Sequence, residues 1–457
     1  MSEVSRARRG GGVWHRAGAW GSQSGAPALA VRHAEGDRPL LQAGANGLLF
    51  KVLLIVLMGM SLLAPFINNT ISAGGGEGSA LRQITYLGVV ALTLLLTVDL
   101  TNPVRVFVLP VSVVLALAWC WSSLIWSIDP STSLRRVILL TLVVWGAFAL
   151  VKALRYEDTI STIRLVLLGT LVLNYIVVIF FPSLGIHQIW EPNNPGIVGS
   201  WRGALMQKNF CGPICVITIL FFLFHRGNYA LWMRVGVMLA AAFFLYQTNS
   251  KTSMGMGIFS LLVGVIVYYY DTRYRLYLIP LTFLSVAVCL PFWSTVTDFI
   301  PQILAQRGAF TGRTDIWRVL VEIASTDPWL GVGYGAFWNL PGAQSPIYAY
   351  SDDWVMLQGN GHNGYLDLVL SVGIPGLLLT VAALIVMPLL NLAASSRPQR
   401  GQRALLVSLT LFVALQNSME STIFDRDMAT GLILVIAAAL THIVTSRSPS
   451  PGDVRRA

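Results

Sequence analysis

The chain has 457 residues, of which 55% are hydrophobic and only 11% are charged. Soluble domains carry about 25% charged residues, so this chain cannot cover its surface with ions and a soluble fold is excluded. The net charge of +10 would suit a nucleic-acid partner in a soluble protein. Its meaning here depends on where the basic residues lie.

Apolar runs recur from Leu48 onward, close to or above the roughly 18 residues that cross hydrocarbon as a helix. Inside a bilayer each backbone amide needs a partner within its own segment, so runs without strand-like alternation are expected to be helices. Counting the short runs gives about twelve spans, within about two. The expected spans are Leu48–Ile67, Ile84–Thr97, Val104–Ile125, Val137–Leu154, Ile163–Phe181, Phe210–Phe224, Leu231–Tyr246, Met254–Tyr270, Leu276–Val296, Tyr365–Leu392, Ala404–Gln416 and Met428–Val444.

The positions of Lys and Arg predict the orientation, because short loops rich in these residues stay in the cytoplasm. With both termini inside, one set of loops and the two tails hold most of the basic residues. These are Arg6, Arg8, Arg9, Arg16, Lys152, Arg155, Arg226, Arg234, Arg273, Arg275, Arg397, Arg400, Arg403, Arg455 and Arg456. The net charge is therefore explained mostly by membrane topology, and no nucleic-acid partner is expected. A basic face also suits contact with anionic lipid.

The expected fold class is an all-α integral membrane protein with about twelve transmembrane helices and one long extracytoplasmic loop containing short helices. Its N-terminal tail has too little hydrophobic content to bury a core, and no cleavable signal precedes the first span. The expected parts are a disordered cytoplasmic tail at 1–45, a first helix bundle at 46–297, the long loop at 298–362, the last transmembrane helices at 363–446 and a cytoplasmic tail at 447–457.

Nine basic residues lie on the outer side, against the topological bias. They are Arg135, Arg136, Arg202, Lys208, Lys251, Arg307, Arg313, Arg318 and Arg426. Each one alone is as well explained as a solvated or paired loop residue. As a group they indicate an anionic ligand on the outer face, because the arginine fork matches phosphate oxygens.

The long outer loop exceeds the roughly 12–15 residues of an ordinary connection, which indicates that it is folded or functional. Its middle, 312–323, predicts a short amphipathic helix capped by Thr314, lying along the membrane surface or packing against the bundle. The glycine cluster 331–335 lacks the pattern of a nucleotide-binding loop. Tight turns that bring backbone close to the membrane or a substrate explain it better.

His362 is the one histidine that combines an outer helix entrance with neighbours that could orient it. A neutral imidazole can accept a proton at physiological pH, which suits a general base acting on a sugar hydroxyl. The alternative is that His362 caps the helix or bonds a loop carbonyl. No metal site is expected, because Cys211 and Cys215 share a helix face without further ligands nearby.

Several short motifs resemble those of the O-antigen ligase and exopolysaccharide polymerase superfamily of bacterial membrane glycosyltransferases. The motifs are Trp201-Arg202-Gly203, Gln207-Lys208-Asn209, Ser250-Lys251-Thr252, Gly312-Arg313-Thr314-Asp315-Ile316-Trp317, Pro328-Trp329-Leu330-Gly331-Val332-Gly333-Tyr334-Gly335 and His362-Asn363-Gly364-Tyr365-Leu366. The resemblance runs from roughly the third span to the last. This chain has Lys251 at a position where the ligases of the superfamily often have Arg. The difference slightly favours a polymerase.

The resemblance implies a multi-pass protein of the bacterial plasma (inner) membrane that transfers glycan at the outer face with inversion, without metal or cofactor. His362 would be the catalytic base, and the donor pyrophosphate would be bound by Arg202, Lys208, Lys251 and Arg313. The supporting candidates are Asn209, Arg318, Asn363 and Glu420. Glu420 could pair with one of the arginines, and Arg318 could instead pair with Glu322.

The implied partners are a polyprenyl pyrophosphate-linked oligosaccharide donor, a glycan acceptor, membrane lipid and envelope machinery for polysaccharide export or chain length. Polymerisation of exopolysaccharide or O-antigen repeat units is favoured, with ligation to lipid A core or protein as the alternative. A polysaccharide or lipid transporter would also have about twelve helices. It would place its polar groups at the midplane, whereas the candidates here gather at one face. A non-catalytic scaffold of an envelope complex is the remaining alternative.

Overall fold

The structure is a computed structural model that describes residues 40–71, 80–97, 107–189, 195–205, 207–274, 312–340, 345–351, 353–426 and 428–446. The regular elements in these ranges are helices, and their one β pairing is an isolated bridge between Ile186 and Trp201. The predicted span Leu276–Val296, the loop to residue 311 with Arg307, and the C-terminal tail lie outside the described residues, as does nearly all of the N-terminal tail. Asn46–Ala457 forms one compact unit.

Each predicted span within the described residues coincides with a helix. The helices are α1 (Leu40–Ile71), α2 (Ala80–Thr97), α3 (Val111–Ser122), α4 (Pro130–Phe180), α5 (Pro182–Gly185), α6 (Lys208–Phe224), α7 (Leu231–Gln247), α8 (Lys251–Tyr269), α11 (Arg313–Thr326), α12 (Ile347–Tyr350), α13 (Gly364–Val381), α14 (Met387–Ala394), α15 (Arg400–Gln416) and α16 (Ala429–Thr445). Within the described ranges, 3 helices are long and apolar enough to cross a membrane. The helical fold is confirmed, and the twelve crossings stay a prediction.

Helix α4 contains two of the predicted spans. It is interrupted at Arg155, whose φ of 61° and ψ of −178° are not helical. Arg155 lies in the basic segment predicted to separate Val137–Leu154 from Ile163–Phe181. The local break therefore falls where the sequence predicts the turn between two spans.

The predicted span Tyr365–Leu392 lies within one long apolar helical segment, Gly364–Ala394, and the structure adds a break in α13 at Gly373, with φ 68° and ψ −179°. The segment after Pro328 lies against this break. The amide of Ile374 donates to the Pro328 carbonyl at 2.8 Å, and that of Val332 donates to the Leu370 carbonyl at 2.9 Å. A Cβ atom on Gly373 would overlap the carbonyl of Trp329. This close approach requires glycine.

The glycine cluster forms tight turns, as predicted, and its backbone approaches the helices of the protein itself. Gly333 has a φ of 101°, and a Cβ there would overlap the side chain of Ser127. Arg136 donates to the carbonyls of Gly335, Trp338 and Asn339, the last two at 2.8 and 3.0 Å. Arg136 is one of the cations predicted to lie on the outer side, and its contacts hold this loop on α4.

The predicted amphipathic helix is α11, and it packs against α13. Ile316, Leu320 and Ile323 are buried together with Phe337 and Leu370 in a second apolar cluster. The sequence predicted that Thr314 caps this helix, and that prediction is wrong. The cap position is the left-handed Gly312, and Thr314 is buried as the second residue of the helix. The packing fixes where Arg313, the first helical residue, lies.

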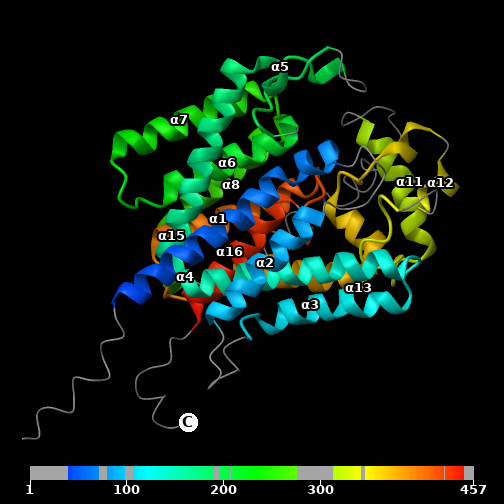
Figure 1. Ribbon diagram of the computed structural model, residues 1–457, viewed down its shortest axis with the longest axis horizontal. Coiled ribbons are helices and arrows are strands. Elements are labelled where there is room, and N and C mark those ends of the chain that lie inside the picture. The colour runs from blue at the N-terminus through cyan, green and yellow to red at the C-terminus, as the bar shows by residue number, and fades with distance from the viewer. Residues whose placement is uncertain are drawn as a thin grey trace, which may run out of the picture. The chain divides into compact units, whose positions relative to one another are not determined.

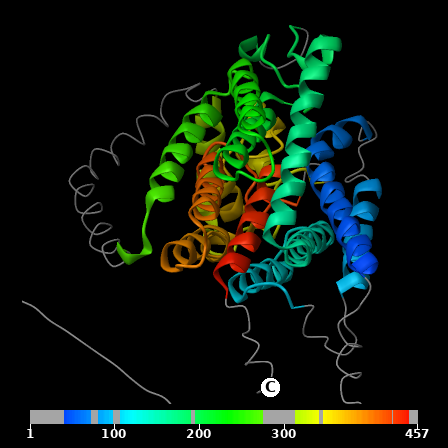
Figure 2. The ribbon, with the colours of Figure 1, turned by 90° about the vertical axis from the view of Figure 1, so that its left-hand side faces the viewer.

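Helices α6 and α8 pack side by side, as Figures 1 and 2 show. A Cβ on Gly212 would lie 2.9 Å from the Cβ of Ser250, so the two helix starts approach closely. Helix α15 packs on both α8 and α6, and α16 packs on α4. This packing brings Lys208 and Lys251, the first residues of α6 and α8, to the same end of the bundle.

Replacing Gly373 by alanine should lower the free energy of unfolding by about 2 kcal/mol or more, because alanine must adopt a left-handed conformation against the Trp329 carbonyl. Thermal unfolding of the detergent-solubilised protein measures this. Gly236→Ala in α7 is the matched control, since a Cβ there has open space, and it should leave stability unchanged or slightly raised. Equal effects of the two variants would contradict the close packing at Gly373.

Candidate functional site

The entrance to α13 places His362. Asn363 caps the helix, because its side-chain oxygen accepts from the amides of Tyr365 and Leu366, each at 3.2 Å. His362 itself has a left-handed φ of 48°, and its amide donates to the Asn360 side chain at 3.0 Å. The alternative that His362 caps this helix is therefore wrong. A non-glycine residue in this conformation is strained, and such strain is typical of functional sites.

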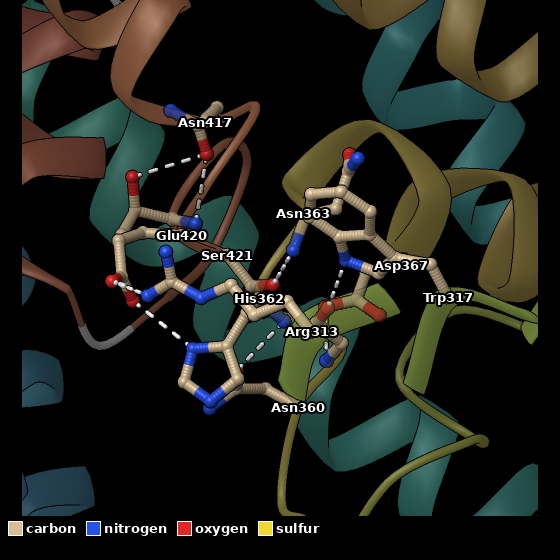
Figure 3. Close-up of polar contacts among 11 residues, drawn as sticks. Arg313, Trp317, Asn360, His362, Asn363, Asp367, Asn417, Glu420 and Ser421 are labelled. Atoms are coloured by element: carbon tan, nitrogen blue, oxygen red, sulfur yellow. Dashed lines mark hydrogen bonds and ion pairs between the residues drawn. The ribbon is translucent and has the colours of Figure 1, made fainter. Parts of the chain in front are cut away.

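The imidazole of His362 contacts the carboxylate of Glu420, which also binds Arg313 (Figure 3). Nδ1 of His362 lies 3.2 Å from one carboxylate oxygen, and Nη2 of Arg313 lies 2.5 Å from the other. The side chains of Glu420, Arg313 and His362 are 7%, 12% and 23% exposed. The ion pair is thus shielded from water, while the imidazole is partly accessible.

Glu420 is placed by a turn that follows α15. The side-chain oxygen of Asn417 accepts from the amides of Thr422 and Ile423 at 2.9 and 2.7 Å, which fixes the turn. The amide of Gly364 donates to the carbonyls of Asn417 and Glu420 at 2.8 and 3.1 Å. The turn is therefore bonded directly to the first residue of α13, next to His362.

Two aromatic residues and one acid hold the loop before His362. The indole of Trp317, on α11, donates to the Gly361 carbonyl at 2.9 Å. The carboxylate of Asp367 accepts from the Gly361 amide at 3.1 Å and from the indole of Trp338 at 2.9 Å. The loop is thereby attached both to the helix that begins with Arg313 and to the helix that His362 precedes.

Lys208 and Lys251 form a second cationic group at the starts of α6 and α8. Burial lowers the pKa of Lys208, which precedes the predicted span, and the nearby charge of Lys251 lowers that pKa further. Helix N-termini carry partial positive charge, which adds to the repulsion between the two ammonium groups. An anion bound between them would relieve that repulsion.

Arg202 lies in the segment before α6. Its Nε donates to the Leu184 carbonyl at 2.7 Å, and its amide donates to that of Gly185 at 2.9 Å. The ring of Trp201 packs edge-on against Tyr175, with ring centroids 6.3 Å apart. Part of the Arg202 guanidinium therefore serves to hold this segment in place.

A small cavity is lined by one residue next to each group of candidates. Its lining comes from α1, α6, α15 and α16, and includes Asn209, which follows Lys208, and Glu420, which bonds His362 and Arg313. The predicted supporting residues Asn209 and Glu420 thus border one space, although neither the lysines nor His362 line it.

Other candidates have separate partners. Arg318 lies 3.8 Å from Asp315 rather than pairing with Glu322, and its side chain is 45% exposed. Arg135 donates to the Thr132 hydroxyl at 3.1 Å. In the part of the chain that the structure describes, no group of three His, Cys, Asp or Glu side chains could hold a metal ion.

Asp367 and Gln416 lie close to the site but were not predicted from the sequence. Asp367 could have been identified from the sequence, because it lies inside a predicted span. An ionisable side chain there costs free energy unless it has hydrogen-bond or charged partners. Gln416 ends an apolar run, and an amide at the end of such a run gives no sequence signal of a special role. Its burial beside the cavity can be recognised only from the packing of the helices.

Residues 235–381 match the model of a family described as O-antigen ligase. The exopolysaccharide production protein ExoQ of Rhizobium meliloti (strain 1021) is 27% identical over 198 residues, which are 41% of this chain and 45% of that protein. The match thus spans less than half of that relative. The family range includes Lys251, Arg313 and His362. Both matches support the O-antigen ligase and polymerase superfamily, and the resemblance seen in the motifs is confirmed.

The ion pair of Arg313 and Glu420 should show strong energetic coupling. Arg313→Met and Glu420→Gln should each destabilise the fold by about 3 kcal/mol, because each leaves a buried charge unpaired, and the double variant should lose less than their sum. Denaturant unfolding of the wild type, the two single variants and the double variant in detergent measures this coupling as a double-mutant cycle. The exposed pair of Asp315 and Arg318 is the control, with coupling below about 0.5 kcal/mol. Additive losses at Arg313 and Glu420 would show that the buried pair is not formed.

Proposed function

We propose, on the premise of its place in the O-antigen ligase and exopolysaccharide polymerase superfamily, that this chain is an inverting membrane glycosyltransferase. It moves a glycan from a polyprenyl pyrophosphate donor to an acceptor sugar hydroxyl at the outer face of the bacterial plasma membrane. The observation that carries the proposal is the contact of His362 Nδ1 with the carboxylate of Glu420, which also binds Arg313.

His362 acts as the general base. When Nδ1 carries the proton and donates it to Glu420, the other ring nitrogen, Nε2, is the acceptor for a substrate proton. The carboxylate therefore sets the tautomer and the orientation of the ring, and it stabilises the imidazolium that forms. General bases placed in this way contribute about 10²- to 10⁴-fold to a rate.

The transfer breaks one bond and forms one. The acceptor oxygen attacks the anomeric carbon as its proton passes to His362, and the bond between that carbon and the phosphate oxygen breaks with its electron pair. Negative charge then builds on the departing pyrophosphate. Fixed cations in a site shielded from water stabilise such charge strongly. Arg313, Lys208 and Lys251 are the residues proposed for this role.

Arg313 can serve both Glu420 and a phosphate. Among the described residues, the Arg313 side chain donates to Glu420, which takes one N–H of the guanidinium. The remaining N–H groups suit phosphate oxygens. Arg202 receives less support, because its Nε is already bonded to the Leu184 carbonyl. Lys208 and Lys251 add two helix N-termini that favour an anion.

The favoured reaction is polymerisation of exopolysaccharide or O-antigen repeat units. The name of the R. meliloti relative, an exopolysaccharide production protein, supports a polymer product, and so does Lys251 in place of the arginine that ligases often carry. The family description, O-antigen ligase, supports the second candidate, which is transfer to lipid A core or protein. Both candidates use the same donor chemistry and differ in the acceptor.

His362→Ala should lower the rate of glycan transfer by at least about 100-fold in proteoliposomes supplied with the lipid-linked glycan, because the acceptor hydroxyl loses its base. Glu420→Gln should lower the rate less, since the ring remains but loses its carboxylate. His442→Ala, at the opposite end of α16 from the site, is the matched control and should keep the wild-type rate. Unchanged transfer by His362→Ala would remove the proposed base, and no transfer by the wild type would favour the scaffold.

A further inference from the structure

His362 has a left-handed backbone, with φ 48°, and the residues on both sides of it are held by hydrogen bonds. A residue other than glycine keeps this conformation only where the surrounding structure enforces it. The contact of Nδ1 with Glu420 depends on this backbone, because the backbone sets the direction of the ring. The groups that bind residues 361 and 363 therefore determine where the imidazole points.

Asp367, the fourth residue of α13, binds the residue before His362. Its Oδ2 accepts from the amide of Gly361 at 3.1 Å, and its Oδ1 accepts from the indole of Trp338 at 2.9 Å. A Cβ on Gly361 would lie 2.5 Å from Oδ1, so the backbone and the carboxylate are in close contact. Both carboxylate oxygens thus have fixed donors.

Ser421 binds the residue after His362. Its hydroxyl oxygen accepts from the amide of Asn363 at 3.1 Å, and its side chain also lies next to the Asp367 carboxylate (Figure 3). Ser421 directly follows Glu420, which contacts the imidazole. Asp367 is therefore connected, directly or through Ser421, to both neighbours of His362 and to the turn that carries Glu420.

This arrangement requires a carboxylate. An asparagine has almost the same shape as Asp367, but it offers one acceptor oxygen, and its NH₂ group would face one of the two N–H donors. A shielded donor that loses its acceptor costs free energy of the same order as the strain of one left-handed residue. Asp367→Asn therefore suffices to release His362 from its conformation.

We propose that Asp367 is a positioning residue that keeps the ring of His362 against Glu420. The inference rests on the proposed function and deepens it, because it explains how the proposed base is aligned. Asp367 acts through the backbone on either side of His362 and binds no substrate. Replacing it should release the ring and leave the proposed diphosphate-binding cations in place.

The first test is the tautomer of His362, measured by solid-state NMR on the full-length protein labelled at its histidine nitrogens in lipid bilayers. His362→Ala identifies the signal. In the wild type at alkaline pH, Nδ1 should carry the proton, because it donates to Glu420. Asp367→Asn should lower this population by about half or more, since a ring without that acceptor populates both tautomers. An unchanged tautomer would overturn the proposal.

Asp327→Asn is the matched control. Asp327 is an exposed acid that accepts from the amide of Leu330 at 3.1 Å, and the oxygen of an asparagine can replace it there. This variant should keep the wild-type tautomer and rate. A similar shift of the tautomer in Asp327→Asn would show that the effect is not particular to Asp367, and would overturn the positioning role.

Transfer kinetics in proteoliposomes give the second test. Asp367→Asn should lower kcat about tenfold and leave the KM for lipid-linked glycan and the affinity for undecaprenyl pyrophosphate within about twofold, because only the base is displaced. In a His362→Ala background the same substitution should have no further effect. A full loss in that background, or an equal loss of diphosphate affinity, would show a general structural role and contradict the proposal.

Ser421→Ala decides the matter if Asp367→Asn does not fold. It removes the acceptor of the Asn363 amide, so it should shift the tautomer of His362 in the same direction, and a wild-type tautomer would overturn the proposal. The proposed function is judged separately. A wild type that transfers no glycan, although Asp367→Asn shifts the tautomer, would contradict that function and leave the positioning role standing.

Discussion

The contact of one buried carboxylate with two side chains from distant parts of the chain determines the geometry of the candidate site. Glu420 lies on the turn after α15, Arg313 begins α11, and His362 precedes α13. A carboxylate that is 7% exposed needs a partner charge, and Arg313 supplies it. The second carboxylate oxygen then remains for the imidazole. The hydrogen bonds from Gly364 to the Glu420 turn keep this arrangement fixed.

Much of the fold could be predicted from the sequence, because in a bilayer an apolar run has few options other than a helix. The amphipathic face of α11 followed from the spacing of Ile316, Leu320 and Ile323, which are buried as that spacing predicts. The break in α13 was missed, because a glycine within an apolar run is compatible with a continuous helix. Pro375, two residues after Gly373, was a signal that a kink was near.

The members of the candidate site could be predicted one by one, but their contacts could not. Glu420 was marked because an ionisable group near a span end is costly, yet its contact with His362 joins residues 58 positions apart. That contact depends on the Asn417 turn, which has no periodic signature. The burial of Gln416 at the end of α15 likewise depends on how the helices around it pack together. Tertiary packing of this kind leaves no local pattern in a single sequence.

The central claim is that the outer cations and His362 form one site for a lipid pyrophosphate. A cryo-electron microscopy structure of the protein in nanodiscs with undecaprenyl pyrophosphate tests it most directly. The account predicts that the diphosphate lies in contact with Arg313 and at least one of Lys208 and Lys251, on the side of Glu420 that carries His362. Density for the diphosphate at the opposite end of the bundle, or away from all three cations, would contradict the account.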